Sequence, residues 1–150
     1  MPNDRQFRLK TRMIATRDVK AYRRTIDEVV GPADVVLEIG CEWGTTSVLL
    51  HAKCARLLAT DVSRECIERA QVMHPEVNFR VLDAFDLRAA LDLDLAVSVI
   101  YIDVSGLSGF RSVLDVLSLL NSYAALMAPR AIVVKSGALV NLARRLEARG

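Results

Sequence analysis

The sequence lacks the features that would place it outside the ordinary globular class. Its three cysteines (Cys41, Cys54 and Cys66) are odd in number and form no C-x-x-C pair, which argues against a disulfide scaffold or a zinc ribbon and favours a reducing compartment. Seven glycines and four prolines exclude a collagen-like or low-complexity chain. The longest apolar stretch, Leu95–Ile102, is far shorter than the roughly 20 residues of a membrane-spanning helix. No apolar segment of the secretory type is visible near the start, so we expect a cytoplasmic protein with no membrane partner.

The remaining composition is that of one globular domain with a basic N-terminal segment. The chain has 150 residues, of which 52% are hydrophobic, and a net charge of +2. Residues 1–24 carry eight Lys and Arg against two acids, and the rest carries twelve against sixteen. We therefore predict a basic arm over residues 1–15 and a folded domain over residues 16–150. Such an arm suits a polyanion such as RNA, and it is equally compatible with a solvated terminus that binds nothing.

Short apolar runs alternate with helical patterns along the rest of the chain. Five β-strands are predicted, over residues 35–39, 56–60, 77–82, 95–102 and 131–134. Helices are predicted between them, the longest over residues 110–127. This alternation predicts an α/β fold with an open, mostly parallel, Rossmann-like sheet flanked by helices, in the strand order 3-2-1-4-5. Ligands of such sheets bind outside the carboxyl ends of the strands.

Candidate binding residues follow three of these strands. Gly40 begins a turn after the first strand, where the backbone can approach a ligand closely, and the following helix directs its free amides there. Glu38, at the end of that strand, would repel a pyrophosphate and suits an ammonium or a ribose hydroxyl. Asp61 lies 21 residues after Gly40 and can accept both hydroxyls of an adenosine ribose. Asp83, with Phe85 beside it, can accept from an adenine amino group.

Four segments resemble motifs of the class I S-adenosylmethionine-dependent methyltransferases. Val36–Cys41 is similar to the glycine-rich motif hhE/DhGxGxG of that family, and Ala59–Ser63 to its second motif. Leu82–Leu87 is similar to its adenine-side motif, and Leu126–Lys135 to the helix-to-strand segment that follows. The resemblance implies a cofactor, S-adenosylmethionine, and a set of residues that contact it: Gly40, Cys41, Trp43 and Gly44 in the first turn, Asp61 and Val62 at the ribose, and Asp83, Ala84 and Phe85 at the adenine.

The sequence departs from the family pattern in two places. Glu42 replaces the middle glycine of the first motif, where its carboxylate either narrows the pocket or reaches the cofactor ammonium. The family fold also has two further strands after the fifth, the last antiparallel, and this sequence supplies neither. We therefore expect an exposed sheet edge on the strand over residues 131–134, through which a homodimer can form.

Asp103 and Lys135 are the candidate catalytic residues. They follow the fourth strand and end the fifth, at the edge where this family presents groups to its acceptor, and they resemble part of the Lys-Asp-Lys-Glu set of RNA ribose methyltransferases. An alternative is that the two form only a salt bridge at the rim. No metal site is expected, because His51 and His74 lack metal-ligand spacing.

The sequence thus predicts a methyltransferase of unknown acceptor, with RNA favoured by the basic arm. One alternative is a non-catalytic module with a methyltransferase-like fold, to which Glu42 and the missing strands point. Another is an NAD(P)-binding oxidoreductase domain. That domain requires G-x-G-x-x-G, and residues 40, 42 and 45 are Gly, Glu and Thr.

Overall fold

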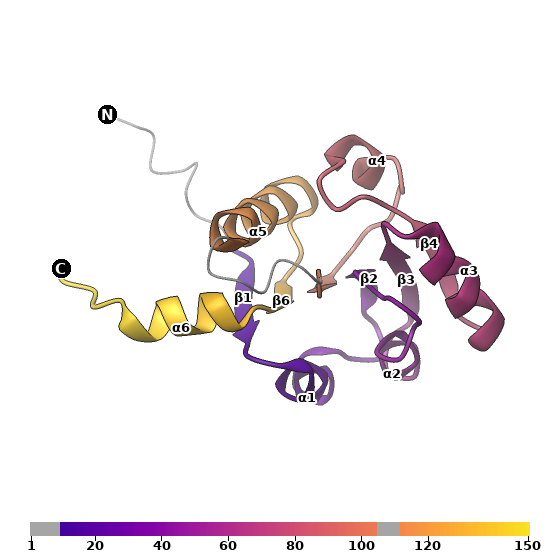
Figure 1. Ribbon diagram of the computed structural model, residues 1–150, viewed down its shortest axis with the longest axis horizontal. Coiled ribbons are helices and arrows are strands. Elements are labelled where there is room, and N and C mark those ends of the chain that lie inside the picture. Colours follow the sequence, from indigo (N-terminus) through magenta and orange to yellow (C-terminus); the bar gives the residue numbers. More distant parts are fainter. Residues whose placement is uncertain (1–9, 105–111) are drawn as a thin grey trace.

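The computed structural model describes residues 10–104 and 112–150, and its centre is one parallel β-sheet (Figure 1). Within the described residues the sheet has six strands: β1 (Arg12–Thr16), β2 (Val35–Ile39), β3 (Arg56–Asp61), β4 (Asn78–Val81), β5 (Val99–Ile102) and β6 (Ala131–Lys135). Their order across the sheet is β1-β6-β5-β2-β3-β4, and every neighbouring pair is parallel. The predicted α/β class with a parallel sheet is confirmed.

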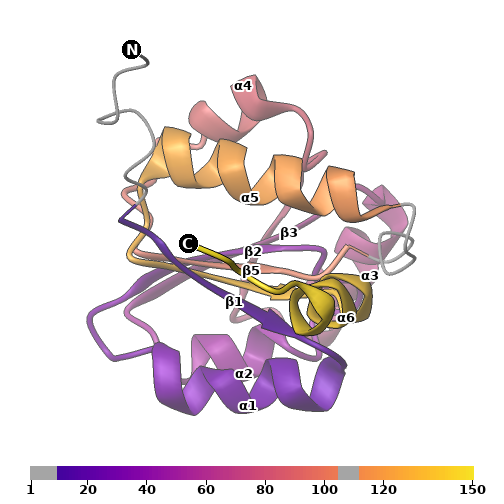
Figure 2. The ribbon, with the colours of Figure 1, turned by 90° about the vertical axis from the view of Figure 1, so that its left-hand side faces the viewer.

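Helices cover both faces of the sheet. In the described part of the chain they are α1 (Val19–Val29), α2 (Ser47–His51), α3 (Arg64–Met73), α4 (Leu87–Leu91), α5 (Val113–Met127) and α6 (Gly137–Arg145). Figure 2 shows α1 and α2 below the sheet and α4 and α5 above it. None of the described helices is long and apolar enough to span a membrane.

Burial on both faces explains why the central strands are continuously apolar. Successive residues of a strand point to opposite faces, so Val36 packs with the α1 and α2 side of the core while Leu37 packs with the α4 and α5 side. Both side chains are fully buried. Side chains that reach the carboxyl edge of the sheet come from the last residues of a strand and from the loop that follows it.

The number of strands was predicted wrongly, because β1 was not recognised. This strand pairs in parallel with β6 over its whole length, from Arg12 opposite Ala131 to Thr16 opposite Lys135. An edge strand has only one neighbour and is less buried than a central strand, so its apolar run is short, here three residues: Met13 is 40% exposed, and only Thr16 is buried. Residues 12–15 of the predicted arm are therefore part of the sheet, and residues 1–9 lie outside the described residues.

The exposed edge predicted for the strand over residues 131–134 is also wrong. That strand, β6, lies between β1 and β5, so both of its sides are paired. The five predicted strands keep the order predicted among themselves, although the strand predicted over residues 95–102 begins only at Val99. The described sheet has its edges at β1 and β4.

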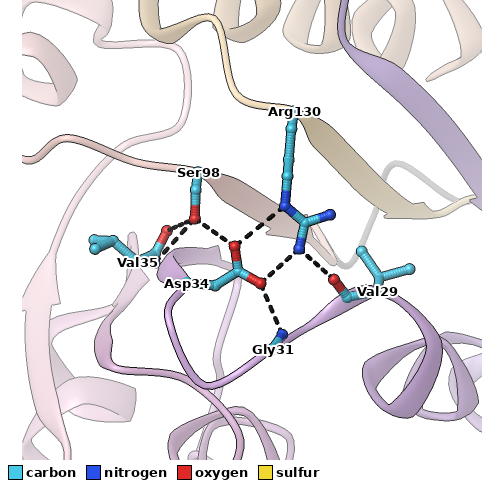
Figure 3. Close-up of polar contacts among 6 residues, drawn as sticks. All are labelled: Val29, Gly31, Asp34, Val35, Ser98 and Arg130. Atoms are coloured by element: carbon cyan, nitrogen blue, oxygen red, sulfur yellow. Dashed lines mark hydrogen bonds and ion pairs between the residues drawn. The ribbon is translucent and has the colours of Figure 1, made fainter.

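A partly buried ion pair connects residues at the amino ends of β2, β5 and β6 (Figure 3). The guanidinium of Arg130, before β6, donates to both carboxylate oxygens of Asp34 and to the carbonyl of Val29. Ser98 donates to Asp34 Oδ1 at 2.8 Å, and the Gly31 amide donates to Oδ2 at 2.7 Å. Burial raises the pKa of Asp34, but the bonds from Arg130, Gly31 and Ser98 outweigh it, and the net pKa is lowered. The network joins the residues that precede β2, β5 and β6, so it stabilises the folded sheet.

Candidate functional site

Two adjoining hollows lie at the carboxyl edge of the sheet, where the loops after β2, β3, β4 and β5 meet. The first, of about 160 Å³, is mostly apolar and is here called the apolar hollow; it is lined by Ile39, Gly40, Asp61, Val62, Leu82, Asp83, Ala84, Phe85 and Val104. The second, of about 270 Å³, is the charged hollow; it is lined by Val19, Arg23, Glu38, Gly40, Cys41, Glu42, Thr45, Thr46, Asp103 and Lys135. Gly40 borders both. The hollows bring together every predicted site residue except Trp43 and Gly44.

The turn after β2 depends on glycine at two positions. Gly40 has φ +87°, and a Cβ there would lie 1.9 Å from the carbonyl oxygen of Asp103. Gly44 has φ +85°, and a Cβ there would lie 2.8 Å from the ring of Phe79. Only glycine combines this conformation with such close approach. The turn is therefore packed directly against the loop after β5, which places Glu38 and Asp103 beside the same hollow.

Asp61 ties this turn to the start of α3. Its Oδ2 accepts from the backbone N–H of Glu42 and its Oδ1 from that of Ser63, both at 2.9 Å. Glu42 itself has φ +50°, a left-handed conformation that is unusual outside glycine and that suits the glycine expected here from the motif that Val36–Cys41 resembles. Each carboxylate oxygen of Asp61 keeps a second acceptor position. The residue can thus stabilise the turn and still bind a ligand hydroxyl.

The remaining residues of the apolar hollow differ in exposure. Phe85 and Val62 are 50% and 66% exposed, so they offer apolar surface to a ligand. Asp83 is exposed, and its Oδ1 accepts from the Phe85 amide at 2.9 Å. Trp43 lines neither hollow, and the guanidinium of Arg69 lies 3.9 Å from the centre of its ring, a cation–π contact.

Glu38 is a buried carboxyl on the floor of the charged hollow. It is 1% exposed and accepts a hydrogen bond from the hydroxyl of Ser47. Burial raises its pKa to about 7 against the lowering effect of the Ser47 bond, and the negative charge of Asp103 adds to the rise. Glu38 therefore changes its charge near neutral pH, in contact with the space that a ligand would fill.

Asp103 and Lys135 form an ion pair at the rim of the same hollow. Lys135 Nζ lies 2.8 Å from Asp103 Oδ1, and the two side chains are 27% and 19% exposed, respectively. The structure thus brings the two predicted catalytic residues together and leaves both accessible. The salt bridge considered from the sequence does form. It is compatible with a catalytic role for the pair and with a purely structural one.

Arg23 is a site residue that the sequence analysis missed. Its Nε donates to the hydroxyl of Thr46 at 3.0 Å, which fixes a guanidinium inside the charged hollow. Arg23 was counted with the basic N-terminal residues. Val19 and Arg23 are four positions apart on one face of α1, but this spacing points to a site only once both side chains are seen to line the hollow.

Metal coordination has no candidate in the described residues. No group of three or more His, Cys, Asp or Glu side chains there is arranged to bind a metal ion.

Comparison with known proteins supplies the family. A family model described as a methyltransferase domain matches residues 36–118, which is more than half of the chain. A search of curated proteins finds no match.

Two solved structures illustrate the structural similarity. DesVI from Streptomyces venezuelae is 17% identical, with a TM-score of 0.59 over 79% of this chain and 52% of that one. The sugar N-methyltransferase KedS8 from a Streptoalloteichus species is 17% identical, with a TM-score of 0.54 over 77% of this chain and 45% of that one. The chain thus spans about half the length of these relatives, and at this identity the similarity shows the fold alone.

Proposed function

Because the chain belongs to the methyltransferase domain family, whose cofactor is S-adenosylmethionine, we propose that it transfers the methyl group of this cofactor to an acceptor at the rim of the charged hollow. The observation that carries the proposal is the pair of hollows that meet at Gly40, one apolar and one charged. Their chemistry matches the two halves of the cofactor, a nucleoside and an amino acid. Family membership also favours methyl transfer over the NAD(P)-dependent alternative.

The residues of the apolar hollow fit an adenosine. Asp61 has an acceptor position left on each oxygen for the ribose hydroxyls. Val62 and Phe85 offer exposed apolar surface for the adenine ring, and the Asp83 carboxylate offers an acceptor for its amino group. Cofactor sites of this kind are typically apolar with a few polar groups that fix orientation.

The residues of the charged hollow fit the amino-acid half. The Arg23 guanidinium can bind the carboxylate, and the Glu38 and Glu42 carboxylates can bind the ammonium. In this arrangement the Glu42 side chain adds a charge complementary to the cofactor. The left-handed backbone at Glu42 keeps the turn in the shape that glycine would give it.

The ion pair at the rim would prepare the acceptor. When bound, S-adenosylmethionine supplies an electrophilic methyl group on a sulfonium, so the protein has mainly to orient the acceptor and exclude water. The Asp103 carboxylate can accept a hydrogen bond, and then the proton, from an acceptor hydroxyl or amine. Lys135 keeps that carboxylate at the rim through its 2.8 Å contact.

RNA is the acceptor class that the described surface supports best. Lys10, Arg12, Arg17, Lys20 and Arg24 are all exposed on β1, α1 and the residues beside them. This basic group belongs to the elements that also supply Arg23 to the charged hollow, so a bound polyanion would lie next to it.

Calorimetry with S-adenosylhomocysteine, followed by tritium transfer from labelled S-adenosylmethionine to RNA and protein fractions, tests the proposal. We expect micromolar binding by the wild type. Asp103→Asn should keep that binding and lose transfer, whereas the control Asp27→Asn, at an exposed ion pair with Lys53, should keep both. Absence of binding by the wild type would refute the proposed function. Binding without transfer to any fraction would support the non-catalytic module instead.

A further inference from the structure

The Tyr22 hydroxyl is the one buried side-chain polar atom in the described residues that has no hydrogen-bond partner. Two other tyrosines are also fully buried, and both are paired: the Tyr101 hydroxyl lies 2.9 Å from Thr25 Oγ1, and that of Tyr123 donates to the Ala84 carbonyl at 2.9 Å. A buried hydroxyl without a partner lowers stability and calls for a functional explanation.

The position of Tyr22 relates it to the charged hollow. It lies on α1 between Val19 and Arg23, which both line that hollow, and its ring packs edge-on against Tyr101 with 5.2 Å between centroids. Burial raises the pKa of Tyr22 well above its usual value, and the charges of Glu38 and Asp103 add to the rise. Glu38 is the register partner of Tyr101 on the neighbouring strand β2, so their side chains share one face of the sheet, and Tyr22, which packs against Tyr101 on that face, is a neighbour of Glu38.

Glu38 is the carboxyl that would use this donor. Among the described residues, the Ser47 hydroxyl is the hydrogen-bond donor to it. The charged and titratable groups around it are Arg23 from α1, Asp61 from β3, Cys41 from the turn, and Asp103 after β5 with its partner Lys135 on β6. A buried carboxylate requires several donors when it is ionised and fewer when it is neutral.

We propose that Tyr22 is a positioning residue whose hydroxyl is unpaired while Glu38 is neutral and donates a hydrogen bond to the Glu38 carboxylate when an ammonium-bearing ligand fills the charged hollow. The inference rests on the proposed function, since the cofactor is the ligand concerned. The cationic ligand ionises Glu38, and the new bond from Tyr22 fixes the carboxylate toward it. The Tyr22 hydroxyl, which is unpaired and destabilising in the free protein, thereby contributes to the affinity for the ligand.

Tyr22→Phe tests this pairing, with Tyr101→Phe as the control that removes a paired hydroxyl from the same cluster. At pH 6 we expect Tyr22→Phe to raise the melting temperature of the free protein by about 2–4 °C, because it deletes an unsatisfied group. In calorimetry at pH 6 it should weaken S-adenosylhomocysteine binding about tenfold. At pH 9, where Glu38 is ionised and accepts from Tyr22 with or without ligand, the difference in affinity should disappear, and Tyr22→Phe should lower the melting temperature instead of raising it.

The control results separate a positioning role from a structural one. Tyr101→Phe should lower the melting temperature and change the affinity equally at both pH values. Methylthioadenosine, which lacks the amino acid, should bind Tyr22→Phe and wild type alike. Equal effects of Tyr22→Phe at pH 6 and pH 9, or none, would overturn the inference while leaving the proposed function intact. Failure of the wild type to bind either nucleoside would instead reject the proposed function and this inference with it.

Discussion

Glu38→Gln should make the protein more stable at neutral pH and not at acid pH. Glu38 is 1% exposed, and burial raises its pKa from 4.5 to about 7. The folded protein therefore favours the neutral carboxyl. Stability from this residue is fully present below pH 4.5, is lost as the pH rises to about 7, and does not fall further above that value. Glutamine keeps an acceptor for Ser47 and cannot ionise.

The expected gain in unfolding free energy follows from the difference in the pKa of Glu38 between the unfolded and the folded protein. A rise from 4.5 to about 7, at about 1.4 kcal/mol for each tenfold change, corresponds to about 3 kcal/mol of unfolding free energy. Glu38→Gln should thus exceed the wild type by up to about 3 kcal/mol at pH 8 and by much less at pH 4.5. Such a gain would mark Glu38 as a residue retained for binding at the expense of stability.

Urea denaturation at pH 4.5, 6 and 8, followed by circular dichroism, measures this difference. Glu68→Gln, on the exposed face of α3, provides the matched control and should differ from the wild type by less than about 0.5 kcal/mol throughout. A difference between Glu38→Gln and wild type that is the same at all three pH values would refute the reasoning, because an uncharged packing change has no pH dependence.

Three further substitutions test other parts of the structure. Arg130→Met leaves the nearly buried Asp34 carboxylate without its cation and should lower the unfolding free energy by about 1–3 kcal/mol in urea titrations; an unchanged value would contradict a stabilising network. Gly40→Ala should abolish cooperative thermal unfolding, because its Cβ would lie 1.9 Å from a backbone oxygen, whereas Gly31→Ala, whose nearest contact is 3.6 Å away, should unfold like the wild type. Asp61→Asn should weaken S-adenosylhomocysteine binding about tenfold in calorimetry while the circular dichroism spectrum is retained, and equal affinity would place the ribose elsewhere.

The central sheet was predictable because its strands are buried on both faces. Val36, Leu37 and Ile100 are apolar whichever face they meet, so a continuous run identifies the strand. The edge strand β1 gives no such signal, since it is stabilised by backbone pairing with β6 and by partial burial. Its existence follows from tertiary contact, which a local pattern does not contain.

The difference between local pattern and tertiary contact also separates the site residues that were predicted from those that were not. Asp61, Asp83 and Asp103 follow strands, and the parallel sheet brings all strand ends to one edge. Arg23 and Tyr22 lie on a helix that precedes the first predicted strand, and their approach to the site depends on how β1 places that helix. The unpaired hydroxyl of Tyr22 is visible only once its neighbours in space are known.

The pairing of β1 with β6 also has a kinetic consequence. Thr16 donates to the carbonyl of Val134, a contact between residues 118 positions apart, and the Ser136 amide donates back to Thr16 at 2.9 Å. A contact of such long range closes late in folding, because the entropy of the intervening loop must be lost first. During synthesis, β1 cannot pair until β6 has left the ribosome. The charged hollow, which includes Lys135 of β6, is therefore expected to form after the apolar hollow, whose strands are neighbours in sequence.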